Sequence, residues 1–142
     1  MKTTIILLFL SGVLFADVLK VGNIFPLNRF YDQFEKKLAI TPQTKEIIIS
    51  FTKENSKEVK AFLATHKGYL KKRQAVYLAD VTSAPSLAIS LFVKPELKKY
   101  DFSVGLMEDD EIAEILPKVE GKTTVIGLDK MLIKSIKFVV GL

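Results

Sequence analysis

The chain has 142 residues, no cysteine and a formal net charge of +5. Without a thiolate it has no redox couple, no cysteine nucleophile and no thiolate metal site. Lysines and acidic residues are interleaved, whereas a nucleic-acid-binding surface needs basic residues clustered on one face. The one basic run of three, Lys71-Lys72-Arg73, is predicted to be the solvated end of a helix. The composition therefore excludes thiol chemistry and argues against nucleic acid as a partner.

Residues 1–16 are typical of a targeting segment. Lys2 supplies a short positive start, residues 5–15 are mostly apolar, and Ala16 is a small residue suited to cleavage before Asp17. The apolar run is shorter than the roughly 20 residues that span a bilayer. We therefore predict a cleaved signal peptide, a periplasmic or secreted protein, and no stable membrane span after cleavage. An uncleaved membrane anchor is the alternative.

The first part of the mature chain predicts β structure. Residues 18–21 are strand-like and end at Gly22, and residues 26–40 resemble a hairpin that turns at 32–35. The segment Glu46–Phe51 contains three consecutive isoleucines. Such an uninterrupted β-branched run is typical of a strand that is covered on both faces.

A helix is predicted after this strand, with Asn55 or Ser56 as its N-cap and Gly68 near its end. The side chains that recur at helical spacing are Val59, Phe62, Leu63 and His66. One face of the helix is therefore expected to be buried, with His66 packed or half-buried at the end of that face.

Strands and helices alternate through the rest of the chain. A strand at 75–79 is followed by a helix that Ser83 is expected to cap, with Pro85 in its first turn. Residues 87–93 continue this helix, and Pro95 is expected to stop or bend it. The later elements are a strand at 102–107, a short acidic helix at 109–116, and a hairpin formed by 123–128 and 132–140 around Asp129-Lys130. This alternation predicts an α/β fold.

The order of these residues resembles the thioredoxin-like superfamily, in particular its peroxiredoxins. The resemblance covers most of residues 18–140 and is best from Tyr100 to Ile126, and the strand-helix-strand order is also similar to that of the periplasmic YtfJ family. It implies one domain over 17–142, a sandwich with a central mixed sheet flanked by helices and an N-terminal β-hairpin.

This sequence departs from the superfamily at the positions that carry its chemistry. The resemblance implies a cysteine motif after the central strand, where residues 52–57 contain no thiol. It also implies a cis-proline near Lys122-Thr123, and for peroxiredoxins an arginine close to Lys122, but neither residue is present there. Lysine keeps the positive charge but lacks the planar fork of arginine.

We predict the sheet to contain 46–51, 75–79 and 123–128 as neighbouring strands. The first helix should cover one face, and the helix starting near Pro85 should cover the opposite face. The start of the first helix and the entry to the strand at Thr123 would then meet at one end of the sheet.

Seven residues are therefore candidates for binding a ligand or partner. Thr52, Asn55, Ser56, Lys122 and Thr123 belong to the former active-site face, and Asp80 and Ser83 follow a core strand at the edge where α/β folds bind ligands.

Other chemistries find little support in the sequence. Ser56 needs a base within hydrogen-bonding reach, but the sole histidine, His66, is ten residues later, about 15 Å along a helix. The acidic residues from Glu108 to Glu114 match no calcium loop and suit the start of a helix. No dinucleotide or phosphate-binding motif is present, so no cofactor is predicted.

The sequence thus favours an exported, non-catalytic binding module for a protein or small ligand. The alternative is an extracytoplasmic enzyme with non-thiol chemistry, such as a cofactor-dependent oxidoreductase. A pocket with convergent ionisable groups would favour the enzyme, whereas an exposed apolar patch would favour the binding module.

Overall fold

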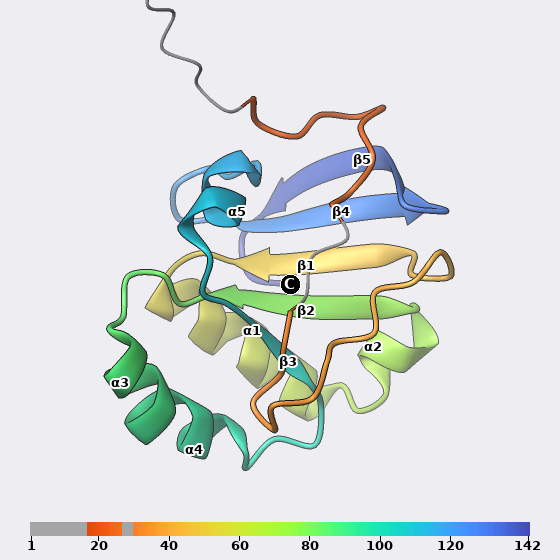
Figure 1. Ribbon diagram of the computed structural model, residues 1–142. Helices are drawn as coiled ribbons and strands as arrows, with labels where there is room; N and C mark the ends of the chain where they lie inside the picture. The colour runs from red at the N-terminus through yellow and green to blue at the C-terminus, as the bar shows by residue number, and fades with distance from the viewer. Residues whose placement is uncertain (1–16, 27–29) are drawn as a thin grey trace, which may run out of the picture.

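A five-stranded mixed sheet forms the centre of the computed structural model, which describes residues 17–26 and 30–142. The strands are β1 (Glu46–Ser50), β2 (Ala75–Asp80), β3 (Val104–Met107), β4 (Thr123–Asp129) and β5 (Leu132–Val139). They lie in the order β3-β2-β1-β4-β5 (Figure 1), with β1 parallel to β2, β2 parallel to β3, and the other pairs antiparallel. The prediction that β1 has β2 and β4 as neighbours is confirmed. The predicted signal peptide at 1–16 lies outside the described residues.

The helices are α1 (Lys53–Thr65), α2 (Tyr69–Lys72), α3 (Ser86–Ala88), the π-helical segment η1 (Ile89–Val93), α4 (Lys94–Leu97) and α5 (Asp110–Ile115). On one face of the sheet, Ile48 and Tyr77 pack with Val59 and Leu63 of α1 and with apolar residues of η1 and α4. Val59 and Leu63 are buried as predicted, and Phe62 is partly buried. The helical layer on this face is therefore built by α1 together with α3, η1 and α4.

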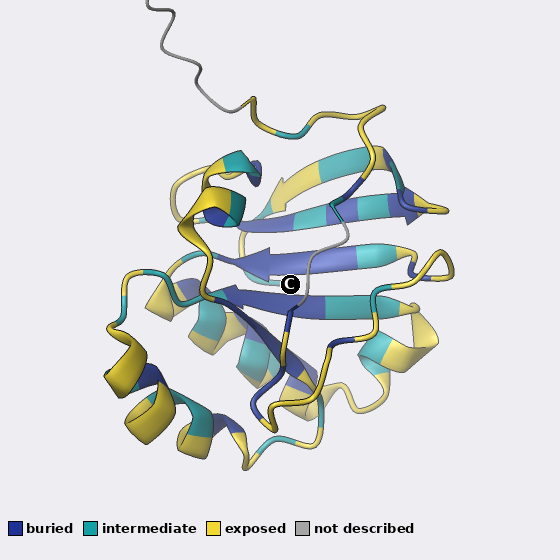
Figure 2. Cartoon of the chain, viewed as in Figure 1, coloured by how far each residue is buried: buried dark blue, intermediate teal, exposed yellow. Residues whose placement is uncertain are grey.

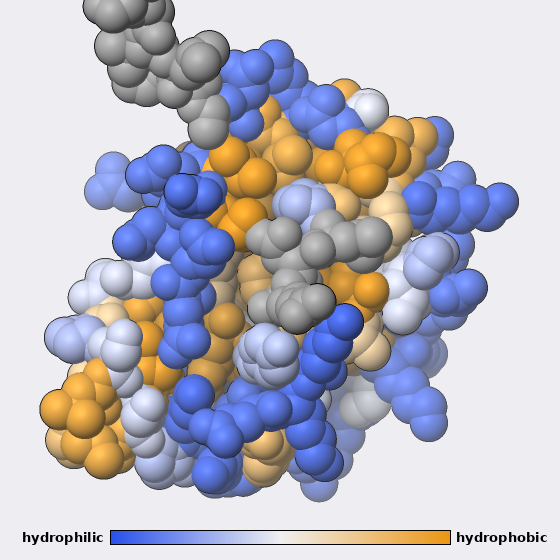
Figure 3. Space-filling view, in the orientation of Figure 1, coloured by the Kyte–Doolittle hydropathy of each residue, from blue (hydrophilic) through white to orange (hydrophobic). Residues whose placement is uncertain are grey.

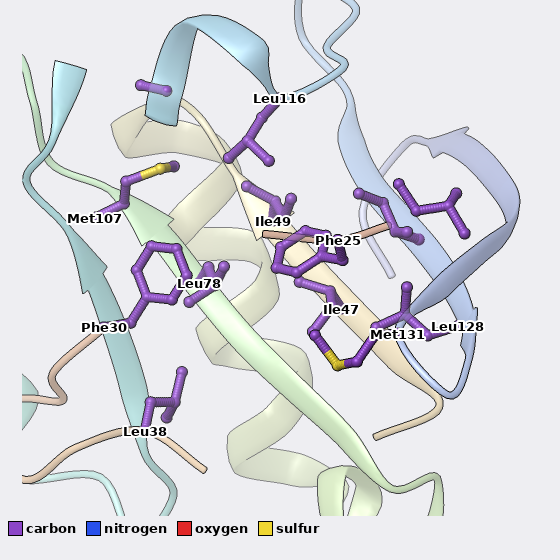
Figure 4. Close-up of a cluster of buried hydrophobic side chains, with 13 residues drawn as sticks. Phe25, Phe30, Leu38, Ile47, Ile49, Leu78, Met107, Leu116, Leu128 and Met131 are labelled. Carbon is purple, nitrogen blue, oxygen red and sulfur yellow. The ribbon is translucent and has the colours of Figure 1, made fainter. Parts of the chain in front are cut away.

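The opposite face is covered differently from the prediction. Ile47, Ile49 and Leu78 pack there against α5 and against the segment that precedes β1, which contributes Phe25 and Phe30 (Figure 4). The helix that follows Pro85 was expected on this face, but it lies on the same face as α1. Successive right-handed crossovers from β1 to β2 and from β2 to β3 run in the same direction across the sheet, so they place their helices on one side.

The segment before β1 covers the sheet without forming regular strands (Figure 2). Residues 18–21 are irregular, contrary to the prediction, and the expected hairpin is reduced to a tight turn with one bridge between Tyr31 and Lys37. The first strand of that hairpin was expected to start at 27, and 27–29 lie outside the described residues. Gln33 is fully buried and donates to the Phe102 carbonyl at 2.8 Å, so side-chain contacts fix this turn against the start of β3.

The N-cap of α1 lies three or four residues earlier than expected. Thr52 is the N-cap, because it has an extended backbone and its hydroxyl accepts a hydrogen bond from the Asn55 N–H at 3.1 Å. Asn55 and Ser56 therefore lie within the first turn of the helix rather than at its cap. Gly68, in a left-handed conformation, separates α1 from α2 as expected.

The helix after β2 starts and ends differently from the prediction. Pro85 is the N-cap of α3, and Ser83 lies before it without capping the helix. The chain then continues through the π-helical turn of η1 into α4, and Pro95 is in the first turn of α4 instead of ending the helix. Proline lacks an N–H and crowds the carbonyl four residues before it, so the wider π turn provides a register in which the helix can continue.

Candidate functional site

A buried cluster of hydroxyl groups lies beneath the start of α1. The Tyr77 hydroxyl is within 2.6 Å of Ser50 Oγ and 3.0 Å of Ser56 Oγ. Burial raises the pKa of Tyr77, and the hydrogen bonds from Ser50 and Ser56 lower it in part. The phenol is therefore neutral near pH 7 and cannot take a proton from Ser56. This arrangement supplies no base that would make Ser56 a nucleophile.

On one side of this cluster, the start of α1 is closed against the entry to β4. Asn55 is buried, and its amide donates to the Gly121 carbonyl at 3.1 Å. Thr123 is fully buried, and its hydroxyl has no hydrogen-bond partner among the described residues. Lys122 is half-buried. The structure thus brings this part of the predicted site together, but it places Asn55 and Thr123 in the interior.

On the other side, α1 borders an open groove with a volume of about 320 Å³. The groove lies at the carboxyl ends of β1 and β2, between the start of α1 and the helix formed by η1 and α4. The predicted site residues that line it are Thr52, Ser56, Asp80 and Ser83. Asp80 accepts hydrogen bonds from the Thr82 N–H at 2.9 Å and the Thr82 hydroxyl at 2.7 Å, which orders the loop at the end of β2.

Lys60 is the half-buried cation of this groove. Its ammonium group lies 5.8 Å from the centre of the Tyr100 ring, and no ion pair or hydrogen bond joins it to another of the residues that the structure describes. Burial lowers the pKa of Lys60, and the nearby Glu96 carboxylate offsets this in part. Lys99, Lys53 and Lys57 lower it further. The groove is therefore positively charged along its α1 side.

An exposed apolar patch adjoins the groove on α3 and η1, here called the Leu87–Phe92 patch. Its members are Leu87, 70 % exposed, Leu91, 57 %, and Phe92, 70 %. Figure 3 shows apolar surface over the α3 region at the lower left. The opposite side of the same helix buries Ile89 and Leu97 in the core. The sequence indicates this patch, because 87–93 has more apolar residues than one buried helix face can hold, and the others must lie on the exposed face.

Other residues singled out in the sequence have structural roles. His66 is exposed rather than half-buried, but its ring packs on Phe62, with the ring centroids 3.9 Å apart. It falls just beyond α1, where the helix no longer holds it against the sheet. Asp109 caps α5 by accepting a hydrogen bond from the Glu111 N–H at 2.9 Å. Arg73, in the basic run, pairs with Glu46 at 3.1 Å on the surface.

Residues 17–26 and 30–142 contain neither a membrane-spanning helix nor a metal-binding cluster of side chains. None of the helices there is both long enough and apolar enough to cross a bilayer. Within the same ranges, no three or more histidine, aspartate or glutamate side chains gather closely enough to hold a metal ion.

The architecture is a thioredoxin-like fold. A PrxQ mutant from Xylella fastidiosa is similar to it with a TM-score of 0.56 at 9 % identity, over 89 % of this chain and 91 % of that one. A peroxiredoxin-like protein from Aquifex aeolicus gives 0.55 at 12 % identity, over 89 % and 79 %. The thioredoxin domain of a thiol-disulfide oxidoreductase from Bacteroides vulgatus gives 0.54 at 12 % identity, over 84 % and 89 %.

At the sequence level, no family model and no curated protein matches the chain. Identities this low show a shared fold and leave the function to be argued from the site.

Proposed function

We propose that this protein is a thioredoxin-like binding module that works without thiol chemistry and acts outside the cytoplasm. The observation that supports the binding role is the groove at the carboxyl ends of β1 and β2 with the exposed Leu87–Phe92 patch beside it. Apolar residues that are exposed singly are normal on a protein surface, whereas a contiguous exposed apolar patch commonly marks an interaction site. Cysteine is absent from all 142 residues, so a disulfide cannot cycle on this chain.

The groove offers less to an enzyme. Ser56 is hydrogen-bonded to a neutral tyrosine, and neither histidine nor cysteine is among the residues that line the groove. An extracytoplasmic enzyme with non-thiol chemistry, the alternative raised by the sequence, would have to use Lys60, Asp80 or Glu96 as its base. Of these, Asp80 accepts two hydrogen bonds from Thr82, and Glu96 is paired with Lys99. We therefore favour binding of a protein or small ligand. A relationship to the periplasmic YtfJ family, whose strand-helix-strand order the sequence resembles, is part of this proposal.

The binding role is tested by site-specific photo-crosslinking. A photoreactive residue at Leu91 should form an adduct with a discrete partner, whereas one at Phe138, an exposed aromatic residue on β5, should not. The identified partner should then bind the purified protein, and Phe92→Ala should weaken that binding while Phe138→Ala leaves it unchanged. Equal loss, or no loss, in the two variants would contradict a site at the groove.

Export and the absence of redox activity have separate tests. The mature protein should begin at Asp17, as mass spectrometry of the expressed full chain would show, and an intact Met1 would reject cleavage. The purified protein should reduce neither insulin disulfides nor peroxides above a buffer blank. Sustained turnover of either substrate would overturn the non-redox assignment.

A further inference from the structure

We infer that the groove binds an extended peptide segment of a protein partner, one that carries a large apolar side chain next to a carboxylate. This inference rests on the proposed binding function and specifies its partner. It follows from two neighbouring properties of the groove, an apolar lining on the side of η1 and a positive charge on the side of α1.

The apolar lining has room for one large side chain. Phe51, Val81, Val93 and Leu97 line the cavity, and Phe92 forms part of the same wall. A volume of about 320 Å³ lies at the lower end of the range for ligand pockets, roughly 300–1,000 Å³. Leu87 and Leu91 continue the apolar surface outside the cavity. A ligand that covers both must extend beyond the cavity, as a polypeptide does.

The charge of the α1 side complements a carboxylate. Lys53 and Lys60 both line the groove, and Lys57 and Lys99 add to the positive potential at Lys60. The nearby acid, Glu96, already pairs with Lys99 at 3.4 Å. An incoming carboxylate would give the half-buried Lys60 ammonium a partner and relieve its repulsion by the other lysines.

A membrane surface fits these observations less well. A bilayer would contact the protruding Leu87–Phe92 patch but would leave the concave groove unfilled. Asp80 and Glu96 also line the groove, and they would be repelled by anionic headgroups. A peptide that enters the groove can place its carboxylate near Lys60, where three further lysines outnumber Glu96. The observations therefore favour a protein partner.

A phage-displayed library of random peptides, selected against the purified mature protein, tests this inference directly. Enriched sequences should combine an aspartate or glutamate with an adjacent aromatic or large aliphatic residue, and the Phe92→Ala protein should not retain them. Enrichment of basic or purely apolar sequences would overturn the inference. So would failure to enrich any sequence above the starting library.

Binding of a selected peptide should then depend on both properties of the groove. Lys60→Met, which keeps the aliphatic stem, should weaken the affinity about tenfold or more, as expected for loss of a charged hydrogen bond. Phe92→Ala should weaken it by a similar factor. Lys137→Met, on the exposed part of β5 at the opposite edge of the sheet, is the matched control and should bind like the wild type.

The failures of the two proposals are distinguishable. If Phe92→Ala weakens binding while Lys60→Met and added salt do not, the groove binds a partner, but the inference that this partner places a carboxylate near Lys60 is wrong. If neither variant affects binding, the groove itself is not the site. Co-sedimentation with phosphatidylcholine vesicles containing phosphatidylglycerol tests the alternative that the patch binds a lipid surface. Vesicle binding that Phe92→Ala abolishes would overturn the peptide inference in favour of a lipid surface.

Discussion

The start of α1 has a closed side toward β4 and an open side toward η1. On the closed side, Asn55 is hydrogen-bonded to the Gly121 carbonyl, and Thr123 is fully buried. On the open side, Thr52 and Ser56 face a groove with Asp80 across it. Both sides carry small polar residues at the same end of the sheet, and the sequence therefore predicts them as candidates for a single binding site.

The difference between the two sides lies in the element that packs next to them. The loop before β4 is held against α1 by the hydrogen bond from the Asn55 amide to the Gly121 carbonyl. The helix after β2 instead buries Ile89 and Leu97 and leaves a gap between its other residues and α1. The polar residues at these strand ends therefore line an open groove only where the neighbouring element stands away from them.

Among the polar residues on and between the two sides, the largest effect on the free energy of unfolding is expected from the Tyr77 cluster. Tyr77→Phe should lower it by about 2 kcal/mol, because the Ser50 and Ser56 hydroxyls each lose a buried partner. Urea denaturation measures this change. Tyr31→Phe, at a half-exposed tyrosine, is the control and should unfold like the wild type.

The same tyrosine makes stability depend on alkaline pH. Because burial raises the pKa of Tyr77 above its unfolded value of about 10, the stability it contributes is fully present below that pH. It is lost as the pH rises from there toward the folded-state pKa. The unfolding free energy of the wild type should therefore fall more steeply above pH 10 than that of Tyr77→Phe. Parallel curves would show that the phenol ionises equally well in the folded state.

A smaller loss of stability is expected on the closed side. Asn55→Ala removes the hydrogen bond to Gly121 and the one that the Thr52 hydroxyl donates to the Asn55 side chain at 3.0 Å. The free energy of unfolding should drop by about 1.5 kcal/mol, as denaturant titration would show. Glu58→Ala, at an exposed position of the same helix, should change it little. If the two variants unfold alike, the closed side contributes no measurable stability.

Thr123→Val should raise stability by about 1 kcal/mol, since valine of similar shape removes a buried hydroxyl that has no partner among the described residues. Thr124→Val is the matched comparison on the same strand. The Thr124 hydroxyl donates to the Pro117 carbonyl at 2.8 Å, so this variant should lose stability. Thermal unfolding of both variants tests the contrast, and a loss in both would mean that Thr123 has a partner in solution.

The smallest effect on stability is expected on the open side. Phe92→Ala should alter the free energy of unfolding by less than about 0.5 kcal/mol, because the side chain is mostly exposed. Ile89→Ala, on the buried side of the same helix, should cost about 2–4 kcal/mol. Chemical denaturation of the pair separates a binding surface from the core, and a large loss for Phe92→Ala would assign that residue to the core instead.

The sequence by itself determined the order of the strands and helices from β1 onward, apart from the short α2, and the central position of β1. Three consecutive isoleucines require cover on both faces, and the spacing of Val59 and Leu63 identifies the buried face of α1. Those signals are local, because each depends on the residues of a single element. The lack of cysteine likewise excluded thiol chemistry without any structure.

Only the tertiary structure decided which elements cover each face of the sheet. The handedness of the two crossovers put η1 and α4 beside α1, and this left the opposite face to α5 and to the irregular segment before β1. The same packing buried Thr123 and left Leu91 and Phe92 exposed, although all three are compatible with either environment. Burial depends on contacts between residues far apart in the chain, so the pattern within one segment does not specify it.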